Sequence, residues 1–454
     1  MMMTLAKVTA ALGASLEGSS RAFAAVSTDT REDLRDKLFI ALRGERFDAH
    51  DFIAEAAAQG AAGAIVAADV PLAVAGFPLI RVADTRQALS TLAAFWRAHF
   101  AIPVIGVTGS NGKTTVKEMC AAILRAWLGE DAVLATQGNL NNDIGVPLML
   151  LRLRAHHRAA VIEMGMNHPG EIAPLAAITR PGVAIVTNAQ RAHLAGMGGL
   201  RPVAAEKGEI YRALPEEGVA VINADDPHAD WWRANHGPAR SVSFGLGDAT
   251  DVGGTAAIKT FGSQVHLRSA EGEIDFELPI PGLHNVRNAL GAAAACLAAG
   301  APLAAVAQGL ERFAGAGGRL QRRQAEGGAI LLDDTYNANP DSVRAAIDVL
   351  TYAPGQKILV LGDMGEIGEM SAQYHDEIGG YAKSAGVDRL FALGEQSALA
   401  ARNFGAGGEH FASCEELIDA LRLALGSEVV VLVKGSRFMR MERVVNALIV
   451  PPAA

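Results

Sequence analysis

The chain of 454 residues has only three cysteines, Cys120, Cys296 and Cys414, which lie far apart. They form no CxxC pair, so the spacing supplies neither a zinc-binding pattern nor a disulfide framework. All three fall in segments of helical character, where we expect buried, unpaired thiols in a reducing compartment. This usage predicts a cytoplasmic protein.

Aromatic residues, basic clusters and strongly apolar runs are also scarce. Phe, Trp and Tyr make up 5% of a chain that is 50% hydrophobic, so its cores must consist mainly of Ala, Val, Leu and Ile. The net charge is −9 without a dense Lys/Arg block, which disfavours nucleic-acid or anionic-membrane binding. The N-terminal segment lacks a basic region before an apolar core, so we expect no signal peptide. The uncharged stretch 290–307 is rich in Ala and Gly and contains Pro302, so we expect a buried helix and no membrane span.

The pattern of apolar runs predicts three α/β domains, at 1–101, 102–313 and 314–454. In the first, short runs at 38–41, 64–67 and 78–82 alternate with Ala-rich helical segments such as 51–59. This alternation is typical of a small α/β domain.

The second and third domains contain continuous apolar runs that end in polar residues, as expected of parallel strands buried on both faces. We predict strands at 103–107, 159–164, 183–188 and 218–223, then at 329–333, 357–361, 389–393 and 428–433. Alternating segments within 239–281 predict an antiparallel extension, followed by a helix at 284–300. Gly315–Gly318 is a predicted hinge into a Rossmann-like, doubly wound third domain.

The segment 104–115, VIGVTGSNGKTT, is typical of a phosphate-binding loop between a strand and a helix. Backbone N–H groups and the helix dipole would face an anion, Lys113 adds a positive charge, and a Thr hydroxyl can bind Mg²⁺. Val107 stands where the general pattern has its first glycine. The alternative is a plain glycine turn followed by a surface lysine.

Polar residues after the next two strands are predicted to share an edge of the sheet with this loop. Glu163 could bind Mg²⁺ there, or merely cap a turn. His193 belongs to the same edge, although an isolated histidine is often a hydrogen-bonded structural residue. By composition alone, Lys207 is a surface lysine of a helix.

Two further loops have side chains suited to sugars, bases or peptide groups. In Asp333–Pro340 the acids suit ribose hydroxyls, and the side-chain amides of Asn337 and Asn339 could form paired hydrogen bonds to a base or substrate amide. In the loop 137–145, Asn139 and Asn142 could bind a sugar or peptide. Ordinary polar turns would have the same composition.

Together these segments resemble the Mur ligases over essentially the whole chain, most closely the type that adds D-alanyl-D-alanine. Residues 27–31 and 38–52 resemble the family's uridine-nucleotide-binding module, and TGSNGKTT at 108–115 resembles its form of the phosphate loop. Further similar segments are QGNLNNDIGVPL (137–148), EMGMNHPGEI (163–172), EKGEI (206–210), INADD (222–226), LPIPGLHNVRNALGA (278–292), GRLQ (318–321), DDTYNANPDSV (333–343) and LVKGSR (432–437).

The resemblance implies a role for each matching residue. Catalytic roles would fall to Lys113, Glu163, His193 and Lys207. Thr114 and Glu163 would hold one Mg²⁺, Glu163 and His193 a second, and Lys207 would carry a CO₂-derived carbamate that helps to order it. The implied ATP-binding residues are Gly109, Asn111, Gly112, Lys113, Thr114, Thr115, Asn285, Asn288, Arg319 and Asp334. Among them, the resemblance places Asn285 and Asn288 at the adenine, Arg319 at the γ-phosphate and Asp334 at the ribose. The implied substrate-binding residues are Asp29, Thr30, Arg31, Asn139, Asn142, Asn337 and Asn339.

The resemblance implies an ATP-dependent amide ligase that joins D-Ala-D-Ala to a UDP-linked muramoyl tripeptide through an acyl phosphate. We expect a monomer that binds no nucleic acid and has no integral membrane segment. The sequence departs from the family pattern at 188–191, where Asn-Ala-Gln-Arg replaces the more usual Asn-Ile-Gly, at 196–199 and at Leu283. These departures remove no proposed metal or phosphate ligand.

Three other functions compete with this prediction. A sister Mur ligase that adds a single amino acid is disfavoured because its diaminopimelate-adding branch carries Asp-Asn-Pro-Arg, which this chain lacks. Folylpolyglutamate synthetase lacks the N-terminal uridine-binding module. A non-catalytic UDP-sugar-binding regulator is disfavoured by the intact Lys113, Thr114, Glu163, His193 and Lys207.

Overall fold

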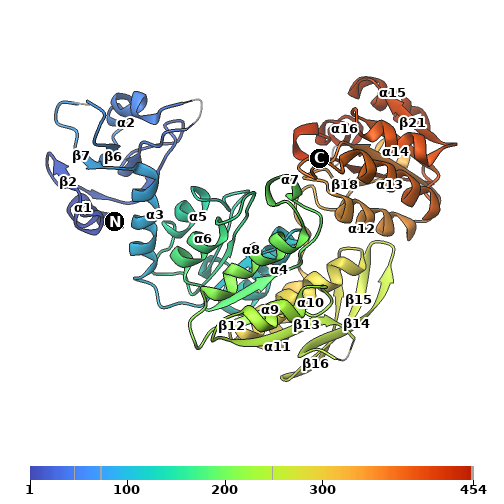
Figure 1. The fold of residues 1–454 in the computed structure, drawn as a ribbon, viewed down its shortest axis with the longest axis horizontal. Coiled ribbons are helices and arrows are strands. Elements are labelled where there is room, and N and C mark those ends of the chain that lie inside the picture. Colours follow the sequence, from blue (N-terminus) through green and yellow to red (C-terminus); the bar gives the residue numbers. More distant parts are fainter. Residues whose placement is uncertain (45–46, 72–73, 248, 451–454) are drawn as a thin grey trace.

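The computed structural model describes residues 1–44, 47–71, 74–247 and 249–450. It consists of three α/β units, each built on its own main sheet. In Figure 1 the first unit (blue) and the last (orange to red) stand apart on the two sides of the central unit. The predicted three-domain α/β fold class is confirmed, whereas the boundaries at 101/102 and 313/314 stay predictions.

The first unit has a five-stranded sheet in the order β2-β7-β6-β5-β4, parallel except for β2. Its strands are β2 (Ser15–Glu17), β4 (Ala25–Ser27), β5 (Lys37–Ile40), β6 (Gly63–Ala67) and β7 (Leu79–Val82), with a separate pair β1 (Met3–Thr4) and β3 (Ala22–Phe23). Its helices are α1 (Leu5–Leu12), α2 (Ile53–Ala58) and α3 (Thr85–Arg97). The predicted helix 51–59 is shorter than expected, because a 3-10 turn at Ala49–Phe52 precedes α2.

The central unit has a nine-stranded sheet in the order β16-β15-β14-β13-β12-β11-β8-β10-β9. Its strands are β8 (Val104–Thr108), β9 (Val133–Ala135), β10 (Ala159–Glu163), β11 (Val183–Val186), β12 (Val219–Asn223), β13 (Arg240–Leu246), β14 (Val252–Lys259), β15 (Gly262–Ser269) and β16 (Gly272–Leu278). The prediction of an antiparallel extension is wrong for β13, which pairs in parallel with both β12 and β14. The antiparallel part begins with the pairing of β14 and β15, where tight turns permit hairpins.

The central parallel strands are buried on both faces, as their continuous apolar runs predict. Successive residues of β8 enter different cores, with Val104 facing one and Ile105 the other. One core contains α4 (Lys113–Leu128), α10 (Leu283–Ala298) and α11 (Leu303–Glu311). The other contains α5 (Gly145–Leu150), α6 (Ile172–Thr179) and α8 (Leu200–Arg212). Helix α3 of the first unit packs on α5 and α6. The short helices α7 (Leu194–Met197) and α9 (Ala229–Asn235) complete this unit.

The uncharged stretch 290–307 forms parts of two helices, which corrects the prediction of a single buried helix. Helix α10 ends at Ala298 and α11 begins at Leu303. Gly300, at φ 92°, and Pro302 lie in the turn between them, and neither residue favours continuation of a helix. Within the described ranges, no helix is long and apolar enough to span a membrane. Cys120, Cys296 and Cys414 are free and buried, as predicted.

The third unit has a six-stranded sheet in the order β17-β18-β22-β19-β20-β21, parallel apart from the edge strand β17. Its strands are β17 (Gln321–Gln324), β18 (Ile330–Asp334), β19 (Gln356–Gly362), β20 (Arg389–Leu393), β21 (Gly408–Phe411) and β22 (Val429–Lys434). Its helices are α12 (Pro340–Thr351), α13 (Ser371–Ser384), α14 (Ser397–Phe404), α15 (Cys414–Ala424) and α16 (Glu442–Leu448). The parallel order and two-sided burial agree with the predicted doubly wound fold.

Candidate active site

The loop between β8 and α4 has a backbone that requires glycine at two positions. Gly109 has φ 151° and Gly112 has φ 81°, values that other residues rarely adopt. A Cβ at Gly109 would lie 1.8 Å from Oγ1 of Thr187, and one at Gly112 would lie 2.5 Å from Oδ1 of Asn288. The two glycines therefore let the loop approach its neighbours closely, at the N-terminus of a helix of 16 residues.

Lys113 folds back over this loop. Its Nζ donates to the carbonyl oxygens of Gly109, at 2.7 Å, and Ser110, at 3.3 Å. Burial lowers the pKa of Lys113 and the nearby Arg319 charge adds to that effect, while Glu163 opposes it. The ammonium group lies where an anionic phosphate would replace the carbonyl oxygens as its partner.

Thr114 connects three parts of the chain. Its Oγ1 donates to Oε2 of Glu163 at 2.9 Å and accepts from Nη2 of Arg319 at 2.9 Å. Glu163 is 2% exposed, and its other carboxylate oxygen accepts from Nδ2 of Asn141 at 2.8 Å. The backbone N–H of Glu163 donates to Oγ1 of Thr136. The carboxylate is therefore held in place beside the Thr114 hydroxyl, an arrangement of oxygens suited to a divalent cation.

His193 lies on the loop after β11 in a left-handed backbone conformation, with φ 57°. Its Nδ1 is 3.0 Å from a carboxylate oxygen of Glu366, which belongs to the third unit. Burial lowers the pKa of His193, and the charges of Lys113 and Lys207 lower it further, whereas Glu366 raises it. A neutral imidazole is the form that binds metals.

Lys207 is 1% exposed and lies on α8, which corrects the composition-based expectation of a surface lysine. No described residue forms a hydrogen bond or ion pair with its Nζ. Burial, together with the charge of Lys113, places the pKa of Lys207 well below its ordinary value. These conditions favour the neutral amine, the form that reacts with CO₂.

No group of three or more His, Cys, Asp and Glu side chains arranged to hold a metal occurs in the described part of the chain. The predicted Mg²⁺ ligands include only two such residues, Glu163 and His193. Mg²⁺ commonly has one or two protein carboxylates and completes its shell with substrate phosphates and water. The Thr114–Glu163 pair suits that mode of binding.

The predicted adenine and ribose residues lie on the two sides of the junction between the second and third units. Asn285 and Asn288 are buried at the start of α10, where Nδ2 of Asn288 donates to Oδ1 of Asn285. Asp334 ends β18, and its Oδ2 accepts from Nζ of Lys434 at 2.6 Å. The ion pair is largely buried and fixes the position of this carboxylate.

The predicted substrate asparagines have defined structural contacts. Oδ1 of Asn142 accepts from the backbone of Gly145 at the start of α5, and Asn139 is exposed. Asn339 caps α12 through Ser342, and its amide pairs with that of Asn111, at 2.7 and 3.2 Å. Oδ1 of Asn337 accepts from its neighbour's backbone N–H. In this structure the side-chain amide of Asn339 therefore forms its paired hydrogen bonds with Asn111 of the phosphate loop.

Asp29, Thr30 and Arg31 lie on the first unit and do not line the central cavity. Arg31 pairs with Asp29 at 2.6 Å, and their side chains are 88% and 35% exposed. The hydrogen bond from Arg31 lowers the pKa of Asp29 to about 2. The carbonyl of Thr30 accepts from Gln59.

A cavity of about 1080 Å³ lies between the central and third units. It brings together thirteen of the predicted residues: Asn111, Gly112, Lys113, Thr115, Asn142, Glu163, His193, Asn285, Asn288, Arg319, Asp334, Asn337 and Asn339. The other predicted residues do not line it: Asp29, Thr30, Arg31, Gly109, Thr114, Asn139 and Lys207. Of these, Thr114 contacts the cavity-lining Glu163 and Arg319 directly.

Four residues with contacts in this site were absent from the sequence-based prediction. Asn141 holds Glu163, and Gln190 hydrogen-bonds to Ser110 and Asn111. Arg191 forms ion pairs with third-unit carboxylates, and Glu366 approaches His193. Asn141 lies within the asparagine-rich loop and was within reach of sequence reasoning. The contacts of Gln190, Arg191 and Glu366 depend on how loops and domains pack, which no local motif predicts.

Comparison with known families places the whole architecture in one group. Residues 22–97 match the model "Mur ligase family, catalytic domain", residues 107–296 match "Mur ligase middle domain", and residues 318–437 match "Mur ligase, glutamate ligase domain". The chain is 44% identical over 452 residues to the UDP-N-acetylmuramoyl-tripeptide–D-alanyl-D-alanine ligase of Escherichia coli strain K12, an alignment that covers 98% of each chain.

Solved structures give the same answer. A crystal structure of MurF from Acinetobacter baumannii superposes with a TM-score of 0.91 at 36% identity and covers 98% of each chain. MurF from Thermotoga maritima, solved in complex with ADP, has a TM-score of 0.81 at 26% identity and covers 93% of this chain and 96% of its own. The chain therefore belongs to the Mur ligase family and, within it, to the MurF branch.

Proposed function

We propose that this protein is an ATP-dependent ligase that joins D-alanyl-D-alanine to UDP-N-acetylmuramoyl-tripeptide, as part of peptidoglycan synthesis. The observation that carries the proposal is the cavity in which Lys113, Glu163 and Arg319 converge from two units. It belongs to a chain that aligns over 98% of its length with a ligase of that name. The products are ADP, phosphate and UDP-N-acetylmuramoyl-pentapeptide.

The reaction consists of two transfers at one carboxyl group. The terminal carboxylate of the tripeptide attacks the γ-phosphorus of ATP, which yields an acyl phosphate and releases ADP. The amine of D-Ala-D-Ala then attacks the acyl carbon, loses a proton, and displaces phosphate as the amide forms. Lys113 and Arg319 neutralise the clustered phosphate charge, because both cations lie at the phosphate loop.

The same site supports the proposal of two bound Mg²⁺ ions. Thr114 and Glu163 would hold the first, and Glu163, His193 and a carbamate on Lys207 would hold or order the second. Bound Mg²⁺ supplies positive charge that offsets the charge developing on the transferred phosphoryl group. The unpaired amine of the buried Lys207 fits a carbamate, because the lysine lacks another partner that would account for its burial.

Phosphate release from ATP by the purified protein tests the proposed reaction. Release should require both UDP-N-acetylmuramoyl-tripeptide and D-Ala-D-Ala, with one amide formed per phosphate. Release that ignores the dipeptide would contradict the proposal. Release supported only by a single diamino acid with the muramoyl dipeptide would instead identify a sister Mur ligase.

Lys207→Ala tests the carbamate separately. We expect activity to fall about 100-fold, the scale expected for loss of one fixed electrostatic group in such a site. Stripping CO₂ should lower the activity of the unmodified protein, and bicarbonate should restore part of it, while the variant should not respond. Full activity in Lys207→Ala would contradict the proposed carbamate.

A monomeric state and a cytoplasmic location stay predictions.

A further inference from the structure

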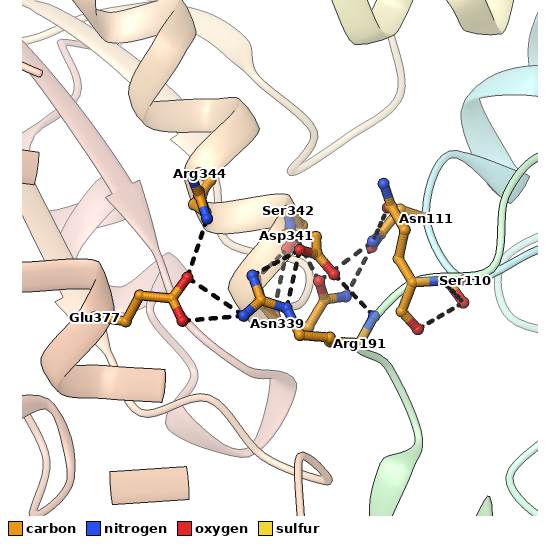
Figure 2. Close-up of polar contacts among 9 residues, drawn as sticks. Ser110, Asn111, Arg191, Asn339, Asp341, Ser342, Arg344 and Glu377 are labelled. Carbon is orange, nitrogen blue, oxygen red and sulfur yellow. Dashed lines mark hydrogen bonds and ion pairs between the residues drawn. The ribbon is translucent and has the colours of Figure 1, made fainter. Parts of the chain in front are cut away.

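The third unit contacts the phosphate loop and its neighbouring loop through a small set of polar side chains, shown in Figure 2. Asn339 and Asp341, at the start of α12, and Glu377 on α13 face the central unit. Their partners are Asn111 of the phosphate loop and Arg191 of the loop after β11. We call Arg191, Asp341 and Glu377 the interdomain clamp.

Arg191 is the centre of the clamp. Its Nη2 lies 2.7 Å and its Nε 3.0 Å from Oδ1 of Asp341, and its backbone N–H donates to the other oxygen at 2.8 Å. Its Nη1 donates to Glu377 at 3.0 Å, and the guanidinium carbon lies 5.0 Å from the ring centroid of Tyr374. One planar guanidinium thus joins two helices of the third unit, which a lysine could not reproduce.

The clamp is partly withdrawn from water. The side chains of Arg191, Asp341 and Glu377 are 17%, 23% and 32% exposed. Burial works against the charge of Arg191, but hydrogen bonds to both carboxylates raise its pKa above the ordinary range. Multidentate, partly buried ion pairs of this kind contribute more than exposed pairs, which are commonly near zero.

The loop that carries Arg191 also holds the phosphate loop. Oδ1 of Asn188 accepts from the backbone of Asn111 at 2.9 Å, and Oε1 of Gln190 accepts from its side chain at 2.7 Å. The backbone N–H of Gln190 donates to Oγ of Ser110. Movement of the clamp is therefore coupled to the phosphate loop through residues adjacent to Arg191.

The amide of Asn111 is shared between the two units. It donates to Gln190 on one side and pairs with Asn339 of the third unit on the other. Arg319 adds a further contact near the start of the third unit, through its hydrogen bond to Thr114. Rotation of α12 away from the central unit would break the Asn111–Asn339 pair and the Arg191–Asp341 pair together.

We propose that Arg191 is a positioning residue, whose clamp with Asp341 and Glu377 holds the third unit against the phosphate loop so that both units present their groups to one nucleotide. The inference rests on the proposed ligase function for its kinetic consequences. The clamp keeps Arg319, Asp334 and Lys113 around a common cavity. It also limits the access of water to the activated carboxyl group, because the docked third unit covers that side of the cavity.

The test compares Arg191→Met with Arg344→Met. Both remove an arginine that pairs with Glu377, but Arg344 lies in the third unit itself, with its guanidinium 4.4 Å from the ring of Tyr381. Arg344→Met therefore removes a comparable ion pair within one domain and serves as the matched control. Asp341→Asn breaks the clamp from the other side and provides the measurement if Arg191→Met fails to fold.

Small-angle X-ray scattering of the unliganded proteins gives the structural result. We expect a larger radius of gyration for Arg191→Met and Asp341→Asn than for the unmodified protein, and no change for Arg344→Met. Equal radii in all four proteins would overturn the proposal. An equal increase in Arg344→Met would also overturn it, because the effect would then not belong to the interdomain contact.

Steady-state kinetics with both substrates gives the functional result. If opening reduces the docked population to about a tenth, KM for ATP rises about tenfold. The ratio of phosphate released to amide formed should also rise above that of the unmodified protein. A variant that combines Arg191→Met with Asp341→Asn should raise KM for ATP no more than the larger of the two single changes, since both changes break one contact. Additive effects on KM would overturn the proposal. If the unmodified protein shows no dipeptide-dependent turnover, the proposed function fails while the scattering test still stands.

Discussion

The two walls of the cavity are built in different ways. On the central wall, Lys113 and His193 follow β8 and β11, and Glu163 ends β10, and the three strands are neighbours in one parallel part of the sheet. On the opposite wall, Asp334 ends β18 of a separate sheet and Asn339 follows that strand. The central wall is fixed by strand register, whereas the second wall lines the cavity only through the docking of its domain.

Because the two walls are built differently, substitutions in them should have two different kinds of effect. A change in the central wall alters the chemistry of a site that its own sheet has already assembled. A change at the second wall alters how often the two walls meet. Variants of the first kind should reduce turnover or the intrinsic affinity of the phosphate loop, and variants of the second kind should act mainly on the apparent affinity for ATP.

The largest effect is expected from Lys113→Met on the central wall. Removing the cation that lies over the phosphate loop should lower dipeptide-dependent phosphate release by about 1000-fold, because it neutralises charge in the transition state. The far-UV circular dichroism should match that of the unmodified protein. A loss of less than tenfold would show that the central wall is not where the phosphoryl group is stabilised.

Gly112→Ala and Gly129→Ala, at the two ends of α4, test whether the shape of the phosphate loop matters beyond backbone strain. Both glycines have positive φ, at 81° and 98°, so each change should cost about 1–3 kcal/mol of stability. A Cβ at Gly129 meets open space, whereas one at Gly112 lies 2.5 Å from Asn288. Affinity for ADP, measured by calorimetry, should fall at least about tenfold in Gly112→Ala, equivalent to ~1.4 kcal/mol. A similar loss of ADP affinity in both variants would mean that backbone strain alone is responsible.

Asn339→Ala and Ser413→Ala compare the second wall with a remote part of the same domain. Each removes a helix cap, of α12 or α15, and should lower the free energy of unfolding by about 0.5–2 kcal/mol. Only Asn339 also pairs with Asn111 across the domains. KM for ATP should therefore rise a few-fold in Asn339→Ala alone. An equal rise in Ser413→Ala would attribute the effect to general loosening of the domain.

The smallest effect concerns the first unit, whose candidate residues belong to neither wall. Arg31→Ala should return the pKa of Asp29 from about 2 towards its ordinary value of 3.8, as measured by an NMR titration. Because the folded-state pKa is the lower one, the pair stabilises the fold above pH 3.8 and this contribution disappears as the pH falls towards 2. An Asp29 pKa that stays near 2 in the variant would show that Arg31 is not its cause.

Local sequence predicted the elements whose signal is local. The apolar runs located β8, β10 and β12 to within a residue or two, because a strand buried on both faces leaves a continuous apolar segment. The edge strands β9, β17 and β21 were not predicted, since such short strands have weak patterns. The pairing of β13 was predicted wrongly, because alternation indicates a strand without fixing its direction.

The candidate site divides in the same way. The phosphate loop and Glu163 were predictable from a glycine-rich turn and a strand-end carboxylate. The environment of Lys207 was not, because its helix turns it inward and composition alone predicts exposure. Arg191 appeared in the sequence only as a departure from the family pattern, and its partners lie 150 and 186 residues further along the chain.

The sequence by itself determined the three-unit α/β architecture and the family, since apolar periodicity and short motifs are local properties that survive without coordinates. It also named candidate groups for phosphate and a divalent cation, whose roles stay predictions. Only the tertiary structure decided that the amide of Asn339 faces Asn111, and that Arg191 joins α12 to the phosphate loop. Those contacts depend on the orientation of one domain against another, and no local run of residues encodes it.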